Sequence, residues 1–214
     1  MLADFLLKAL LAYLLGSLLG SLIVGKLKGG VDIRTQGSGN AGGTNALRTQ
    51  GWKFAAGVMA IDIGKGWLAT AWLPQLALPG LTATVALPWL QVACAMSVVF
   101  GHIYPLWFGF RGGKGAATLV GVVAGLAPAA LPYVLAAWLL VLMFTGYVGL
   151  STMLATAGFN VWVWLTAPVE REALWLFGVS MTVLIIYTHR SNIERMRAGN
   201  ENRARKLWLF KPRA

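Results

Sequence analysis

Long apolar runs fill most of this chain and limit what it can fold into. Single runs cover about residues 3–24, 54–73, 82–103 and 172–188, and a longer tract covers 116–167. A helix that crosses a bilayer needs roughly 20 mostly apolar residues. Of the 214 residues, 57% are hydrophobic and 12% are charged, whereas soluble domains carry about 25% charged residues. A core of this size cannot bury so much apolar surface, so the sequence predicts an all-α, polytopic integral membrane helix bundle.

The tract 116–167 decides how often the chain crosses the membrane. Helix-breaking residues interrupt it at Pro128, Pro132, Gly146 and Gly149. It forms either one long helix and a loop, which gives five spans, or three segments near 116–128, 130–146 and 148–167, which gives seven. The turn signal at Thr145, Gly146 and Tyr147 favours seven spans.

Positive charge gathers in the polar stretches 25–53, 104–115 and 189–214, which hold 15 of the 18 Lys and Arg residues. By the positive-inside rule these stretches face the cytoplasm, so the N-terminus lies outside and the C-terminus is cytoplasmic. The net charge of +11 invites a nucleic-acid partner, but its position at the edges of apolar runs argues against nucleic acid. Trp208 and Phe210 in the basic tail indicate anchoring to anionic membrane lipid.

The N-terminal apolar run resembles a signal peptide. It extends from about residue 5 to 24, which is too long for a signal peptide core, and no small-residue cleavage site follows it, so we expect a retained first helix. Cys94 lies in an apolar run and is expected to be a buried, inert thiol. The spans leave no room for a separate soluble part, so we expect one membrane-embedded domain over residues 1–214.

The first polar stretch contains GSGNAGGTNALRTQG, residues 37–51. Gly37, Gly39 and Gly42 match the dinucleotide pattern G-x-G-x-x-G, but an apolar helix precedes them where that fold needs a strand. Glycine-rich backbone amides before a helix N-terminus still form an anion site. Polar side chains that can assist are Ser38, Asn40, Thr44, Asn45 and Arg48, the last by a bidentate contact to phosphate. The alternative is a flexible polar connector.

The second stretch, residues 101–118, contains the sequence GGKG. It is not a Walker A loop, because Phe108 stands where that motif needs Gly and Gly115 where it needs Ser or Thr. Gly112, Gly113, Lys114 and Gly115 nevertheless form a compact cationic site for an anion. His102 precedes them, either as a substrate contact or as an imidazole bonded to a backbone carbonyl.

The third stretch, residues 188–202, places His189 and Asn192 three apart, on one face if the last helix continues. Glu194 or Glu201 can pair with the nearby Arg190 and Arg195 as a brace. The alternative is a solvated, basic helix end. Within an apolar run, Asp62 and Lys65 lie one turn apart, where charge is costly. They form either a structural ion pair, which we favour, or a support for a phosphate through Lys65.

In this order and at these membrane positions, the three stretches resemble the bacterial acyl-phosphate:glycerol-3-phosphate acyltransferase family (PlsY). That family's motifs are approximately GSGNxGxTNxLR, GHxxPxxxxFxGGKGxAT and HRxNIxRxxxGxE, which match Gly37–Arg48, Gly101–Thr118 and His189–Glu201. The specific resemblance covers about 45 residues. The chain departs from it at Ala41, Arg111 and Thr188, where the family often has Pro, Lys and a basic residue.

The resemblance implies transfer of an acyl group from acyl phosphate to the 1-hydroxyl of sn-glycerol 3-phosphate. The products are lysophosphatidic acid and inorganic phosphate, in the first step of phospholipid synthesis. It also implies a multi-pass enzyme of the bacterial cytoplasmic (inner) membrane, and the basic stretches place its active site on the cytoplasmic side. We expect no cofactor and no metal, because the two histidines lack ligand-like neighbours in the sequence.

We assign catalytic roles to Ser38, Arg48, His189 and Asn192. Substrate-binding roles go to Gly37, Gly39, Asn40, Gly42, Thr44, Asn45, Lys65, His102, Gly112, Gly113, Lys114 and Gly115. The first loop is expected around the acyl phosphate and the developing oxyanion, and residues 112–115 around the phosphate of glycerol 3-phosphate. His189 is the best side-chain base, since an imidazole has an ordinary pKa of about 6.5. Alternatively a phosphate oxygen of the donor, with a second pKa of about 6, takes the proton.

The rival function is a membrane carrier or binding protein for an organic phosphate. A carrier places its site near the bilayer midplane, between repeats. Here the polar residues gather on one side of the membrane, which favours the enzyme. No feature of the sequence indicates an oligomeric state.

Overall fold

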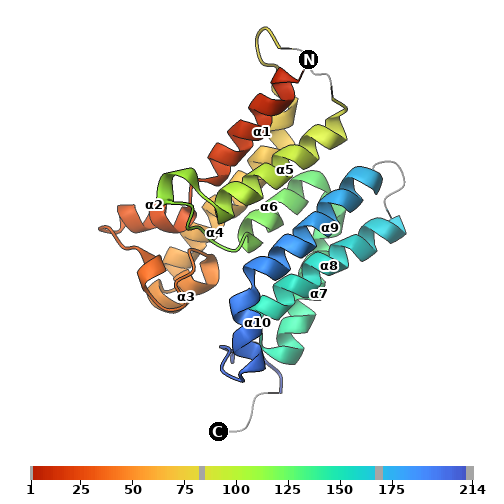
Figure 1. The fold of residues 1–214 in the computed structure, drawn as a ribbon. Helices are drawn as coiled ribbons and strands as arrows, with labels where there is room; N and C mark the ends of the chain where they lie inside the picture. Colours follow the sequence, from red (N-terminus) through yellow and green to blue (C-terminus); the bar gives the residue numbers. More distant parts are fainter. Residues whose placement is uncertain (1, 82–84, 167–170, 211–214) are drawn as a thin grey trace. The chain divides into compact units, whose positions relative to one another are not determined.

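The computed structural model describes residues 2–81, 85–166 and 171–210, and these form helices and loops without a strand. The expected all-α architecture is therefore confirmed for the described part of the chain (Figure 1). The chain divides into two compact units, Met1–Pro128 and Ala129–Ala214. Each unit is described by itself.

The first unit contains two sets of elements. Its helices are α1 (Ala3–Gly16), α2 (Gly20–Leu27), α3 (Gly43–Gln50), α4 (Trp52–Trp67), α5 (Leu87–Ile103) and α6 (Ala116–Leu126). Its short helical turns are η1 (Ile33–Thr35), η2 (Leu68–Trp72), η3 (Leu73–Gln75) and η4 (Leu106–Phe108). The π-helical turn η2 and the turn η3 extend α4 directly.

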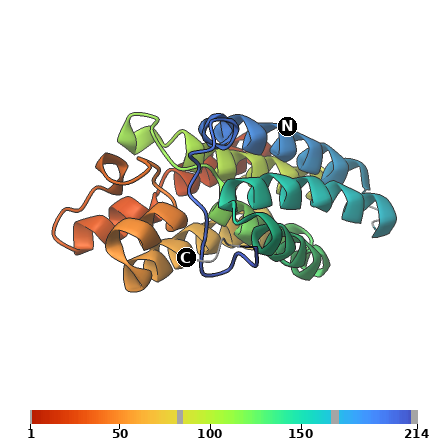
Figure 2. The ribbon, with the colours of Figure 1, turned by 90° about the horizontal axis from the view of Figure 1, so that it is seen from below.

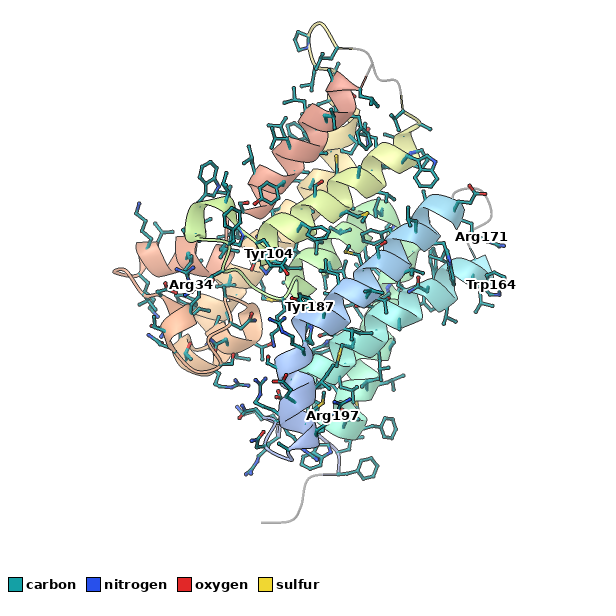
Figure 3. All side chains as sticks on the ribbon, viewed as in Figure 1. Arg34, Tyr104, Trp164, Arg171, Tyr187 and Arg197 are labelled. Atoms are coloured by element: carbon teal, nitrogen blue, oxygen red, sulfur yellow. The ribbon has the colours of Figure 1, made fainter. Side chains whose placement is uncertain are left out.

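The second unit contains the helices α7 (Leu131–Thr145), α8 (Val148–Thr166), α9 (Arg171–Thr188) and α10 (Arg190–Arg197), and η5 (Pro128–Ala130) lies at the boundary of the units. In Figure 2, α8 lies between α7 and α9. Phe159 of α8 meets Phe177 of α9 edge-on, with ring centroids 5.9 Å apart. In Figure 3, Arg171 lies beside Trp164 at one end of this helix pair, 5.6 Å from the centroid of that ring.

The helices follow the apolar runs expected from the sequence, except that the run 3–24, expected as one helix, is divided into α1 and α2. Residues 82–84, residue 167 and the end of the tail at 211–214 lie outside the described part. By length and composition, four described helices can cross a membrane, or five if α1 and α2 count as one span with a 46° bend. Helix α6 is shorter, with 11 residues. The three segments expected in the tract 116–167 are thus separate helices, while the count of seven spans stays a prediction.

A buried ion pair supports the break between α1 and α2. Such a break exposes carbonyl groups at the end of one helix and N–H groups at the start of the next. Lys65 of α4 donates from Nζ to the carbonyls of Gly16 and Leu18, at 2.9 and 2.8 Å. Asp62 accepts a hydrogen bond from the Gly20 N–H at 3.1 Å and pairs with Lys65 at 2.9 Å. The cation therefore caps the C-terminus of α1 and the anion caps the N-terminus of α2, as the helix dipoles favour.

Glycines allow the helices of the first unit to approach closely. A Cβ on Gly16 of α1 would overlap the Val98 carbonyl of α5, and one on Gly101 of α5 would overlap the Tyr13 carbonyl of α1. Small residues at helix contacts are typical of membrane bundles, because close backbone approach maximises van der Waals packing. The end of α5, from which the second polar stretch begins, is thereby held against α1.

Replacing Lys65 with Met should strongly destabilise the protein, because the buried Asp62 carboxylate would lose its cation. Breaking a buried pair costs about 3–5 kcal/mol, which corresponds to a fall in Tm of roughly 6–20 °C. Thermal unfolding of the detergent-purified protein measures this. Lys53→Met, which removes an exposed charge from the same helix, is the matched control. Equal Tm values for the two variants would show that the ion pair does not support the break.

Candidate functional site

Asn45 organises the first glycine loop, which we define as residues 36–45. Its Nδ2 donates to the carbonyls of Ile33, Gln36 and Asn40 at 2.9–3.0 Å, and its Oδ1 accepts from the Ser38 N–H at 2.9 Å. The residue is 1% exposed, so its amide is committed to the loop backbone. The expectation that Asn45 touches substrate stays a prediction, and the geometry favours a role in shaping the loop.

Glycine is required in this loop at Gly37. Its φ is +57°, and a Cβ there would overlap the Asn45 Oδ1 atom. Only glycine combines a left-handed backbone with such close approach at little cost. Gly39 also has a positive φ, of +72°. The two expected glycine positions are thus needed to wrap the backbone around Asn45.

Three polar side chains of the first motif are exposed, namely Ser38, Thr44 and Arg48. Gly42 is the N-cap of α3, and no side chain caps that helix end. Asn40 is half-buried, and its carbonyl is one of the Asn45 acceptors. An uncapped helix N-terminus with exposed hydroxyl groups close to it in the chain suits an anion, and Arg48 lies in the last turn of the same short helix. A core cluster packs α3 against α4 and η1. Its buried members are Ile33, Ala46, Phe54, Ala55 and Val58.

The second glycine loop, which we define as residues 104–115, folds back onto the end of α5. The Gly112 N–H donates to the Ile103 carbonyl at 3.0 Å, and the Gly113 N–H donates to the His102 carbonyl at 3.1 Å. A Cβ on Gly113 would overlap the His102 ring. These two glycines therefore cap α5, and the half-buried Lys114 follows them directly.

Three residues of the second loop have left-handed backbone. Gly109 has φ +63° and Gly115, the N-cap of α6, has φ +90°. Phe110 has φ +58°, which costs a residue with a side chain roughly 1–2 kcal/mol. Its N–H donates to the Pro105 carbonyl at 3.0 Å. Strain of this kind persists where the surrounding structure determines the backbone.

His102 and Lys65 belong to the buried cluster below the second loop. Their side chains are 2% and 3% exposed, and Lys65 Nζ lies 3.0 Å from His102 Nδ1. Asp62 Oδ1 lies 3.4 Å from the same ring nitrogen. Since the Lys65 ammonium already faces two carbonyls and a carboxylate, the geometry favours the structural alternative for Lys65 over contact with substrate. His102 fits the same description, because its ring supports Gly113.

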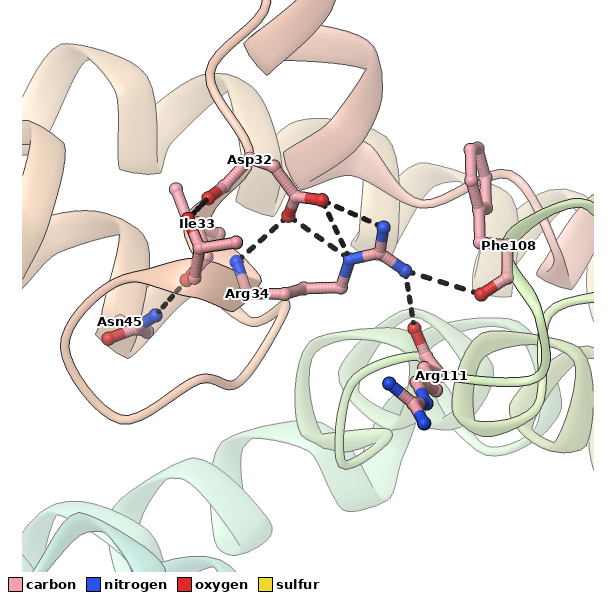
Figure 4. A network of polar contacts seen from close by, with 7 residues as sticks. Asp32, Ile33, Arg34, Asn45, Phe108 and Arg111 are labelled. Atoms are coloured by element: carbon pink, nitrogen blue, oxygen red, sulfur yellow. Dashed lines mark hydrogen bonds and ion pairs between the residues drawn. The ribbon is translucent and has the colours of Figure 1, made fainter.

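Arg34 connects the two loops (Figure 4). Its Nε and Nη2 donate to the Asp32 carboxylate at 2.8–3.1 Å, and its Nη1 donates to the carbonyls of Phe108 and Arg111 at 3.3 and 3.1 Å. The hydrogen bonds from Arg34 lower the pKa of Asp32 below its ordinary value, so the pair persists at neutral pH and weakens as acid protonates the carboxyl. The side chains are 25% and 36% exposed, and such pairs contribute only about 0–1 kcal/mol to stability.

The third motif lies in the second unit, where the chain breaks between α9 and α10 at His189. The buried His189 places Nδ1 2.8 Å from the Ile185 carbonyl. A carbonyl oxygen only accepts, so Nδ1 carries the proton and the neutral ring has its lone pair on Nε2. A base or hydrogen-bond acceptor needs this tautomer. The expected shared face of His189 and Asn192 required the last helix to continue through both residues. Instead α9 ends at Thr188 and α10 begins at Arg190, so that condition is not met.

Asn192 and Arg195 are tied to Glu201. Asn192 Nδ2 donates to one carboxylate oxygen at 2.9 Å and Arg195 Nε to the other at 2.6 Å. Of the two glutamates considered from the sequence, Glu201 therefore makes the predicted brace. Asn192 also packs against Gly149 of α8, where a Cβ would lie 3.0 Å from its Cγ. The tail continues along this unit, with Arg203 stacked 4.0 Å from the Trp208 ring centroid.

Within the first unit, Arg34, which precedes the first motif by three residues, bonds directly to Phe108 and Arg111 of the second motif. The structure buries Asn45, Lys65 and His102 in supporting positions and leaves Ser38, Thr44 and Arg48 exposed. Asp32 and Arg34 were not among the site residues expected from the sequence. A signal for them exists, since Asp32 is the one acid in the basic stretch 25–53.

Known proteins match this chain over most of its length. A sequence model of the family described as glycerol-3-phosphate acyltransferase matches residues 6–199, which include parts of both units. A glycerol-3-phosphate acyltransferase of Chlorobaculum parvum is 37% identical over 226 residues, with 93% of this chain and 96% of that protein covered. One from Synechococcus sp. is 41% identical over 190 residues, with 88% and 89% covered.

Two solved structures are also similar. One is the crystal structure of PlsY (YgiH), an integral membrane glycerol 3-phosphate acyltransferase, in its glycerol 3-phosphate form, with a TM-score of 0.79, 33% identity and 94% and 96% of the two chains covered. The lysophosphatidic acid form of PlsY gives a TM-score of 0.79 and 32% identity, with 98% and 100% covered. The resemblance seen in the three motifs is thereby confirmed, and the chain belongs to the glycerol-3-phosphate acyltransferase family.

Proposed function

We propose that this protein is a membrane enzyme that transfers a fatty acyl group from acyl phosphate to the 1-hydroxyl of sn-glycerol 3-phosphate. The glycerol oxygen forms a bond to the acyl carbon, and the bond from that carbon to the phosphate oxygen breaks. The hydroxyl proton leaves with inorganic phosphate or through a base, so the products are lysophosphatidic acid and phosphate.

One observation carries this proposal. The chain resembles, over nearly its whole length and at 33% and 32% identity, two solved forms of one acyltransferase whose names give glycerol 3-phosphate and lysophosphatidic acid. These compounds are the acceptor and the product of the proposed reaction. The positive charges of Arg48, which follows the first glycine loop, and of Lys114 in the second loop agree with substrates that both carry phosphate.

The first glycine loop is proposed to hold the acyl phosphate. The exposed Ser38 precedes and the exposed Thr44 follows the N-cap Gly42 of α3, where N–H groups and the helix dipole favour an anion. The exposed Arg48 lies in the last turn of the same eight-residue helix. As the glycerol oxygen attacks, charge develops on the acyl carbonyl oxygen, and donors already in place stabilise it. Ser38 and Arg48 are the donors to which we assign this role.

The second glycine loop is proposed to hold the phosphate of glycerol 3-phosphate. Lys114 supplies the positive charge, while Gly112, Gly113 and Gly115 keep the backbone free of side chains. His189 is proposed to accept the hydroxyl proton on Nε2, for which the Nδ1 contact to Ile185 prepares the ring. Asn192, held by Glu201, is proposed to orient the acceptor.

We propose seven spans in the bacterial cytoplasmic membrane, with the N-terminus outside and the site and C-terminus in the cytoplasm. The apolar runs of the sequence and the positive-inside rule support this topology. We also propose that residues 1–214 act as one acyltransferase domain, which the family match across both units supports.

The reaction itself is tested with the detergent-purified protein, given acyl phosphate and glycerol 3-phosphate. We expect one phosphate released for each lysophosphatidic acid formed, because the two products arise in the same step. Vesicles that contain the protein and move an organic phosphate without forming product would instead support the carrier.

Changing Lys114 to Met and Arg48 to Met should separate the two phosphate sites. A hydrogen bond to a charged group is worth about 1.5–3 kcal/mol, or roughly 10- to 150-fold in an equilibrium constant. We expect Lys114→Met to raise KM mainly for glycerol 3-phosphate and Arg48→Met to raise it mainly for acyl phosphate. Steady-state kinetics with each substrate varied in turn measures both values. The opposite pattern would exchange the two assignments.

His189→Gln should lower kcat by about 100-fold or more if the imidazole is the base, since general base catalysis contributes about 10²–10⁴-fold. The loss should diminish as the pH rises, because hydroxide then replaces the base. We propose to record kcat against pH for this variant and for Arg197→Gln, an exposed control on α10. A raised KM with unchanged kcat would assign the proton to the donor's own phosphate and leave His189 with a binding role.

A further inference from the structure

The guanidinium of Arg34 joins two segments that are far apart in the sequence. One side of the group, Nε and Nη2, donates to the Asp32 carboxylate at 2.8–3.1 Å. The other side, Nη1, donates to the carbonyls of Phe108 and Arg111 at 3.3 and 3.1 Å, 74 and 77 residues further along the chain. The ring of Phe108 also lies 5.9 Å from Arg34 Cζ.

Both ends of this contact lie next to the residues that shape the loops. Arg34 follows Ile33, whose carbonyl accepts from Asn45 at 2.9 Å. Arg111 precedes Gly112, whose N–H caps the end of α5 at 3.0 Å. A shift at Arg34 would therefore change the spacing between the first and second glycine loops rather than the internal shape of either.

The chemistry of Arg34 does not suit a substrate contact. Its charge is compensated by Asp32, and its donors point to a carboxylate and to carbonyls. Arg48 of the first motif, by contrast, is exposed. Only the planar fork of arginine bonds to a carboxylate on one edge and to carbonyls on another, so lysine cannot replace it.

We propose that Arg34, anchored by Asp32, is a positioning residue that sets the spacing of the two glycine loops. This inference rests on the proposed function, in which each loop holds one phosphate-bearing substrate. The acyl carbon and the attacking hydroxyl must approach within roughly 3–3.5 Å, and a misplacement of about 1 Å costs on the order of 100-fold in rate. The bridge through Arg34 would thus act on the rate of transfer and not on the binding of either substrate alone.

The test is Arg34→Gln, with Arg34→Lys as the variant that keeps the charge and loses the fork. We expect kcat to fall at least about tenfold in both. The Kd of each substrate, measured separately by calorimetry with a single substrate present, should change by less than about threefold, because each loop keeps its own ligands. Lys26→Gln, which removes an exposed charge from the same basic stretch, is the matched control and should keep the wild-type kcat.

Asp32→Asn supplies a double-mutant cycle. If Asp32 acts only by anchoring Arg34, the double variant with Arg34→Gln should be no slower than Arg34→Gln alone, within about threefold. Losses that multiply would show that the two residues act independently and would overturn the anchored bridge.

Hydrogen exchange provides a readout that does not depend on activity. Amide exchange over residues 104–115 should accelerate at least about tenfold in Arg34→Gln and not in Lys26→Gln, because the second loop loses its tie to residue 34. Unchanged exchange would overturn the inference even if the acyltransfer is confirmed. A large rise in the Kd of one substrate in Arg34→Gln would show that Arg34 is a ligand of that substrate and would overturn the inference. A fall in Tm that matches the fall in activity would show a purely structural role and would also overturn it. A wild-type protein without acyltransfer would refute the proposed function, while exchange would still decide on the bridge.

Discussion

The Asp62–Lys65 ion pair is the interaction on which the first unit depends. An apolar helix that stops and restarts leaves backbone groups unbonded, and in a membrane such groups have no water to turn to. The pair supplies a cation to the carbonyls of Gly16 and Leu18 and an anion to the N–H of Gly20. From there the chain leads through α2 to the first glycine loop. The same pair touches His102, on whose carbonyl and ring the second loop rests. One ion pair thus stabilises both the break between α1 and α2 and the histidine that contacts the second loop.

Polar side chains in and beside the two glycine loops fall into two groups, those already hydrogen-bonded within the protein and those that are exposed. The side chains of Asn45, His102 and Arg34 lie within hydrogen-bond distance of other groups of the protein. The side chains of Ser38, Thr44 and Arg48 are exposed. The proposed function assigns the phosphate groups of the substrates to the exposed donors, because the committed donors are already bonded within the protein. A lone acid is tolerated in the basic stretch 25–53, because the charge of Asp32 is neutralised within two residues.

The helices and the three motifs could be predicted from the sequence because both are local signals. Apolar runs of span length mark helices, and glycines beside cations mark loops for anions. The break at residues 17–19 could not be predicted, because LLGSLLGS continues the apolar pattern on both sides. The Asp62–Lys65 ion pair could be predicted from its spacing of one turn. The other contacts of Lys65, and the supporting roles of His102 and Arg34, involve partners 37 to 77 residues away, and spacing along the chain does not reveal such contacts. The hydrogen bonds by which Asn45 gathers the loop backbone were likewise not predicted, because a polar residue in a glycine-rich stretch suits a ligand role as well as a structural one.

The position of Asn45 along the chain has a consequence for the order of events during synthesis. Residues 33–40, whose backbone it gathers, leave the ribosome before Asn45 does, and the core residue Phe54 that packs under α3 follows later still. The loop therefore lacks the hydrogen bonds of Asn45 until α3 has been synthesised and has packed against the core cluster that contains Phe54. The fold of residues 33–40 thus depends on a residue and a core that are synthesised after them.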